Sequence, residues 1–181
     1  MGLKVMAHAS SVEGTALTVA CGVDSLEHGY FVSRDTLARM AGRGIAWVPT
    51  LIPVAAQARE PLRRNHSPGQ LAVIEKTYRH QMAMVDAARG LGVVIGVGTD
   101  AGASGVRHGL SYAGELALLA EAGLSPAEVI RAATAGGARI LGLEKQIGTV
   151  VPGMAACLIG VRGNPLENPD VLKKPVLALI P

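Results

Sequence analysis

The sequence is poor in aromatic residues and in cysteine, and it has no long apolar run. Aromatic residues are 3% of the 181 residues, and alanine, valine, leucine and glycine together make up about half of the chain, as is common in α/β proteins. The two cysteines, Cys21 and Cys157, are too few and too isolated for a disulfide framework or a cysteine zinc site, and we expect a reducing cytoplasm. No apolar run approaches the roughly 18 residues that span a bilayer, and residues 1–4 lead straight into a strand-like segment, so we expect neither a membrane partner nor a secretory signal.

Clustered charge is also missing. The chain has 17 Lys and Arg against 14 Asp and Glu, and the only basic doublets are Arg63-Arg64 and Lys173-Lys174. A nucleic-acid-binding surface needs basic residues gathered on one face, so scattered ones predict a solvated surface and no nucleic-acid partner. Hydrophobic residues are 49% of the chain, which is typical of a globular protein rather than a disordered one.

Short apolar segments alternate with helical patterns over most of the chain. Strands are expected at residues 3–8, 23–29, 45–50 and 93–97. Helices are expected between them and after them, at 11–21, 33–41, 67–91, 110–122 and 125–141. Strands that alternate with helices predict right-handed βαβ units and a parallel sheet.

Several boundaries have local signals. Residues 10–13 and 125–128 fit capping boxes, in which a serine caps a helix and a glutamate reaches back. Pro68 follows Ser67 at a position where a helix tolerates proline. Residues 51–67 are expected to form a long loop, and two strand-like runs at 155–161 and 175–180 flank a turn.

Three candidate site residues stand at or near the ends of expected strands. Asp100 follows the apolar segment 93–97 and lies between glycines, while His8 and His28 close two other strands. Because the carboxyl ends of parallel strands lie at one end of a sheet or barrel, these side chains are expected to converge. Imidazole and carboxylate suit zinc or a similar divalent metal, which lowers the pKa of a bound water, and Asp100 would be the general base.

A plainer interpretation remains open, in which each of these residues is only a hydrogen-bonded polar group at a strand end. His66 and His80 are expected on the surface, and Glu27 is expected to be structural because it points to the opposite face of its strand. His108 lies in the loop after Asp100, where it either contacts a substrate or caps the next helix.

The motifs Ala7-His8-Ala9, residues 20–29 and Gly98-Thr99-Asp100-Ala101-Gly102 resemble the amidohydrolase superfamily. The nearest branch is similar to imidazolonepropionase and to Xaa-Pro dipeptidase. Further similar segments are residues 115–116, 124–126, 131–134, 141–143, 147–149, 151–153 and 163–166.

The resemblance implies a β/α barrel with a small β-sandwich and the hydrolysis of an amide, cyclic amide or dipeptide C–N bond. His8 would close the fifth barrel strand, His28 the sixth and Asp100 the eighth. The two histidines would bind the more exposed metal, and Asp100 would bind the buried one and act as base. One or two divalent ions, zinc or another metal, are implied, with a small-molecule or dipeptide-like substrate.

Other family features are absent, namely the His-x-His motif of the first strand and the carboxylated lysine of the fourth. A full β/α barrel needs roughly 250 residues. Cys157 replaces the aspartate usual in the tail, and Gly136-Gly137 falls where better helix formers are usual. The chain therefore resembles the C-terminal half of an amidohydrolase, with a half barrel over 1–145 and a β tail over 146–181.

A half barrel exposes two sheet edges and an apolar inner face, and open edges are templates for strand pairing. We therefore expect self-association or a complementary N-terminal half. The alternative to a hydrolase is a non-catalytic half barrel, or a fragment that works only with such a partner.

Overall fold

The fold is built on a small parallel sheet. The structure, a computed structural model, describes residues 2–59 and 61–180. Strands β1 (Met6–Ala9), β2 (Ser25–His28) and β3 (Ala46–Val48) lie in the order β1-β2-β3, and both pairings are parallel. The expected strand–helix alternation is confirmed here, because α1 (Val12–Ala20) and α2 (Arg34–Arg43) connect the three strands.

The expected strand at residues 93–97 lies beside β3 but is much shorter than predicted. It forms one parallel bridge, between Trp47 and Ile95. The Trp47 N–H donates to Val94 O, and the Gly96 N–H donates to Trp47 O, both over 2.9 Å. Because these groups alternate along a strand, the N–H and C=O of Ile95 point away from β3. Within the described part of the chain they have no backbone partner, so the ladder has one side only.

The helices begin and end largely where the sequence indicates. Ser11 caps α1 by accepting the Gly14 N–H, but Glu13 takes no part, so the capping box expected at residues 10–13 is wrong. The box expected at Ser125 is present, and Ser67 forms another with Gln70. The remaining helices of the described chain are α3 (Leu51–Ala58), α4 (Pro68–Leu91), α5 (Tyr112–Glu121), α6 (Pro126–Arg131) and α7 (Gly137–Leu141), with short 3₁₀ turns at Leu62–Asn65 and Pro169–Lys173.

Helix α3 corrects the prediction of a loop over residues 51–67. Its first two N–H groups, at Leu51 and Ile52, donate to the carboxylate of Glu115, which comes from α5. Pro53 lies in the first turn, where its missing N–H costs no intrahelical bond. The cap comes from a residue distant in sequence, so the local pattern could not reveal this helix.

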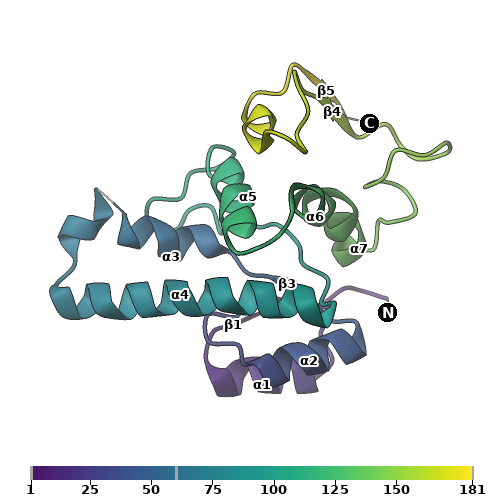
Figure 1. The fold of residues 1–181 in the computed structure, drawn as a ribbon. Coiled ribbons are helices and arrows are strands. Elements are labelled where there is room, and N and C mark those ends of the chain that lie inside the picture. The colour runs from purple at the N-terminus through teal and green to yellow at the C-terminus, as the bar shows by residue number, and fades with distance from the viewer. Residues whose placement is uncertain (1, 60, 181) are drawn as a thin grey trace.

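The two faces of the sheet are covered differently. Leu26 and Trp47 are fully buried in the main core, which includes apolar residues of α2, α4 and α5. Ala46 and Val48 alternate with Trp47 along β3 and form a second small cluster with Ile140 of α7. Helix α7 thus covers part of one sheet face, whereas an exposed apolar inner face was expected. Figure 1 shows α1 and α2 together on one side of the strands and α6 and α7 on the other.

Residues Ala132–Gly136 form a π-helical turn between α6 and α7. A Cβ atom on Gly136 would lie 2.7 Å from the carbonyl oxygen of Ile95, which is closer than real Cβ contacts. The glycine therefore lets this turn approach the open side of the fourth strand segment. This explains why glycine occurs where a better helix former would be expected.

The C-terminal segment forms a separate two-stranded sheet. Strands β4 (Leu158–Gly160) and β5 (Leu177–Leu179) pair antiparallel, as the two strand-like runs predict. The intervening turn Pro169–Lys173 contacts α5, and Leu172 packs against the main core. In Figure 1 this yellow segment lies away from the parallel sheet. No helix in the described part of the chain is long and apolar enough to span a bilayer.

Candidate functional site

The structure brings His8 and His28 into contact at the carboxyl end of the sheet. They lie on the adjacent strands β1 and β2, where Ala9 pairs with His28. Their ring centroids are 4.5 Å apart, and the planes meet edge to face at 66°. His8 is exposed, whereas His28 is 9% exposed. An exposed imidazole and a buried imidazole are therefore in contact at this end of the sheet.

Left-handed backbone marks three strand ends. His28 (φ 66°), Thr50 (φ 47°) and Asp100 (φ 51°) are the non-glycine residues with positive φ in the described part of the chain. Each follows or closes a parallel strand segment. Such conformations cost of order 1–3 kcal/mol each and persist where the surrounding structure enforces them, often at functional sites. The common placement of all three points to this end of the sheet.

Trp47 helps to enforce the left-handed conformation of His28. Its indole N–H donates to the carbonyl oxygen of His28 over 3.1 Å, in a fully buried position. The next residue, Gly29, also has positive φ, and a Cβ there would lie 2.9 Å from the indole nitrogen. A side chain at residue 29 would therefore displace the tryptophan that holds the turn.

The ring of His28 is held by a hydroxyl, and its surroundings disfavour the charged form. Its Nδ1 atom lies 2.8 Å from the Thr50 hydroxyl oxygen. Burial lowers the pKa of His28 most, the neighbouring His8 lowers it further, and the charge of Asp100 raises it. The neutral imidazole, which is the form that binds a metal, is therefore favoured.

Asp100 is exposed and lies beyond the fourth strand segment. Burial shifts the pKa values of His28 and Tyr30 most, and the charge of Asp100 raises both, so Asp100 lies near enough to act on both rings. The preceding Gly98 allows close packing, because a Cβ there would lie 2.7 Å from the Val48 side chain. Among residues 2–59 and 61–180, however, no group of three or more His, Cys, Asp or Glu is arranged to hold a metal ion.

The donors fit a divalent metal in kind but not in number. Two neighbouring imidazoles, one of them neutral with its second nitrogen hydrogen-bonded, match the usual form of metal-binding histidine. A catalytic zinc site takes three protein ligands and keeps one open position. The described part of this chain provides the histidine pair, and Asp100 does not complete a three-residue group with it.

Two polar side chains that the sequence analysis missed support the turn after β3. Glu115 is completely buried, and its two carboxylate oxygens accept the Leu51 and Ile52 N–H groups, both over 2.8 Å. Burial raises the pKa of Glu115 to about 7, although both hydrogen bonds oppose the rise. Gln81 is also completely buried and donates to Pro49 O over 3.2 Å, while its Oε1 has no partner in the described chain.

Tyr30 is a further neighbour that the sequence analysis missed. Its ring centroid lies 5.6 Å from that of His28. Burial and the charge of Asp100 raise the pKa of Tyr30, and the neighbouring Thr50 side chain lowers it. Thr50 could have been noticed, because it ends the third strand as His28 ends the second.

The other sequence candidates lie outside this cluster. His108 is exposed in the loop before α5. In the described part of the chain no side chain caps α5, so His108 is not the helix cap that was expected. His66 and His80 are half-buried rather than on the surface, because they bond Gln57 Oε1 and Val32 O. Glu27 bonds Ser25 over 2.6 Å, in line with the structural role expected for it.

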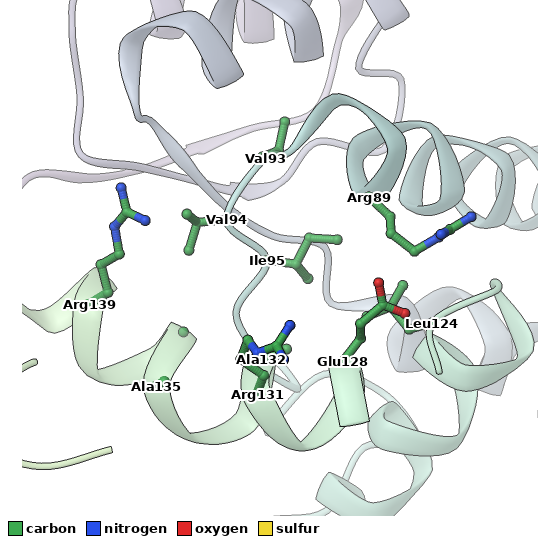
Figure 2. Close-up of a pocket in the computed structure, with 11 residues that line it drawn as sticks. Arg89, Val93, Val94, Ile95, Leu124, Glu128, Arg131, Ala132, Ala135 and Arg139 are labelled. Atoms are coloured by element: carbon green, nitrogen blue, oxygen red, sulfur yellow. The ribbon is translucent and has the colours of Figure 1, made fainter. Parts of the chain in front are cut away.

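A pocket of about 280 Å³ lies elsewhere, between the start of the fourth strand segment and α6–α7. Figure 2 shows its apolar floor at Val93–Ile95, with Arg89, Arg131 and Arg139 around it. Since a strand rises about 3.3 Å per residue, Asp100 lies at the opposite end of this segment. The pocket is therefore separate from the histidine pair.

Comparison with known proteins identifies the family. A sequence profile described as the amidohydrolase family matches residues 1–178. The chain belongs to the amidohydrolase family. It is 32% identical over 183 aligned residues to the uncharacterized protein Rv2915c of Mycobacterium tuberculosis, covering 99% of this chain and 47% of that protein.

Two solved amidohydrolase-like structures are similar to the whole chain. A Xaa-Pro dipeptidase with methionine bound in its active site has a TM-score of 0.82 and 30% identity, covering 96% of this chain and 42% of the other. A prolidase in complex with N-methylphosphonate-L-proline has a TM-score of 0.80 and 30% identity, covering 94% and 41%. The chain thus spans less than half the length of these relatives.

Proposed function

We propose that this chain supplies metal ligands and the general base of a metal-dependent amidohydrolase that cleaves an amide, cyclic amide or dipeptide C–N bond. The observation that carries the proposal is the contact of His8 with His28 at adjacent strand ends, where the charge of Asp100 also acts. The similar dipeptidase and prolidase support a small dipeptide-like substrate.

In this proposal, His8 and His28 hold zinc or a similar divalent ion through their imidazole nitrogens. One ion, or two in a complete site, supplies Lewis-acid polarisation when bound. Asp100 removes a proton from the attacking water as the water oxygen bonds to the carbonyl carbon. The C–N bond then breaks, and Asp100 returns the proton to the leaving amine. His108, in the same loop as Asp100, would contact the substrate.

We also propose that the sheet is half of a β/α barrel, with residues 1–145 as the half barrel and 146–181 as part of a small β-sandwich. The order β1-β2-β3 followed by residues 93–97 supports four consecutive parallel strands. Exposed apolar side chains lie at the edge strand β1, namely Met6 within it (59% exposed) and Val5 just before it (52%). Such an edge favours pairing with a complementary half or with a second copy.

The test is hydrolysis of a dipeptide panel that includes Xaa-Pro substrates, with zinc present. The chain is assayed alone and mixed with the N-terminal part of the related Xaa-Pro dipeptidase. We expect turnover in the mixture, its loss with a chelator, and its loss in Asp100→Ala but not in the surface control Asp35→Ala. Turnover that persists in Asp100→Ala would contradict the proposal.

A second candidate is a non-catalytic assembly module. It is favoured by the lack of any three-residue metal cluster among the described residues. This candidate predicts that the mixed sample forms a complex of defined mass by light scattering but never hydrolyses a substrate, with or without zinc. Hydrolysis that requires Asp100 would exclude it.

A further inference from the structure

Glu115 lies where a helix cap is needed. Thr50 is the N-cap residue of α3, and threonine at this position usually accepts an N–H of the first turn. Here its side chain makes no such bond, because the hydroxyl faces Nδ1 of His28. The carboxylate of Glu115 accepts the Leu51 and Ile52 N–H groups instead. Glu115 thus caps the helix, and the Thr50 hydroxyl is left to bond His28.

Gln81 holds the other side of the same turn. Its amide donates to the carbonyl oxygen of Pro49, the residue before Thr50. The backbone on both sides of Thr50 is therefore bonded to buried side chains from α4 and α5. These bonds explain how threonine keeps a left-handed conformation (φ 47°, ψ 63°) that a β-branched residue rarely adopts.

The hydroxyl of Thr50 is also the hydrogen-bond partner of the His28 ring. Its oxygen lies 2.8 Å from Nδ1 of His28, where it can accept an Nδ1–H. A histidine that donates from Nδ1 presents the lone pair of Nε2, and metal-binding histidines are commonly oriented by such a partner.

The geometry points to Glu115 as a positioning residue that orients His28 through the turn at Thr50. This inference rests on the proposed function only where it says that the oriented His28 ring serves to bind a metal. The arrangement itself, from Glu115 through the start of α3 to the Thr50 hydroxyl and the His28 ring, is a property of the folded chain. Through it, the buried carboxylate of Glu115 on α5 orients the imidazole of His28 on β2.

The test uses the full chain labelled with ¹⁵N-histidine and compares Glu115→Ala, Thr50→Val and a control. The control is Glu128→Ala, which also removes a helix-capping carboxylate but caps α6. The first readout is the ¹⁵N shifts of His28, which report its tautomer without any metal. The second is zinc affinity, for which loss of an orienting partner typically costs 10–100-fold.

We expect the Nδ1-protonated form of His28 in the unmodified chain and in Glu128→Ala, and its loss in both other variants. Unchanged His28 shifts in a folded Glu115→Ala chain would overturn the inference. If that variant does not fold, Thr50→Val provides the test. Unchanged His28 shifts in Thr50→Val would show that the Thr50 hydroxyl does not orient the ring, which would also overturn the inference. A chain that shows the expected shifts but binds no zinc would support the positioning role while contradicting the proposed function.

Discussion

The buried carboxyl group of Glu115 should make the stability of the protein depend on pH. Glu115 is completely buried, and burial raises its pKa from 4.5 to about 7. The folded pKa is higher than the unfolded one, so the fold favours the protonated form. The resulting stabilisation is complete below pH 4.5 and is lost as the pH rises through about 7.

The size of this effect follows from the shift. About two and a half pKa units, at about 1.4 kcal/mol each, correspond to about 3.5 kcal/mol of unfolding free energy. Urea unfolding between pH 5 and pH 8.5 should show most of this decline. Burial raises the pKa values of Tyr30 and Tyr112 most, and the charge of Glu115 raises them further, so both tyrosines stay neutral throughout this range.

Glu115→Gln removes the titration while keeping one acceptor for the start of α3. We expect the variant to be less stable by about 1–3 kcal/mol at pH 5, because one buried N–H loses its partner. The difference should shrink or reverse by pH 8.5. Parallel stability curves for the two proteins across this range would refute the reasoning.

Three further substitutions test the packing by urea unfolding. Gly136→Ala should lower the free energy of unfolding by about 1–3 kcal/mol, because the new Cβ would meet the Ile95 carbonyl. Gly90→Ala, which has open space around it, should raise the free energy of unfolding by up to about 1 kcal/mol. Equal effects of these two substitutions would contradict the close approach. Trp47→Phe should cost about 1–3 kcal/mol through the unpaired His28 carbonyl. Ser125→Ala should cost about 1 kcal/mol through loss of the capping box, and no loss would contradict that cap.

The sequence predicted those elements whose signals are local. Serine caps, glycine stops and apolar periodicity placed α2, α4 and the three parallel strands. Helix α3 escaped prediction because its cap, Glu115, is 64 residues from Leu51. The contact of α7 with the inner sheet face escaped as well, since a single Ile140 carries it and periodicity does not specify which face a helix covers.

In the candidate site, too, the residues with local signals were predicted and those that depend on long-range contacts were not. His8 and His28 were predicted to converge because both close parallel strands, and the structure places their rings in contact. The supporting residues Gln81 and Glu115 act through long-range hydrogen bonds, which leave no local pattern. A glutamate or glutamine on an otherwise apolar helix face is the signal that could have indicated them, whereas the position of Thr50 at a strand end was visible in the sequence.

Zinc binding by the histidine pair is the most direct test of the central claim. Calorimetric titration of zinc into the full chain should show one bound ion, and binding should be lost in His8→Ala and in His28→Ala. The control His66→Ala removes a histidine that bonds Gln57, away from the pair, and should bind like the unmodified chain. Zinc binding that survives both substitutions, or its absence from the unmodified chain, would contradict the account.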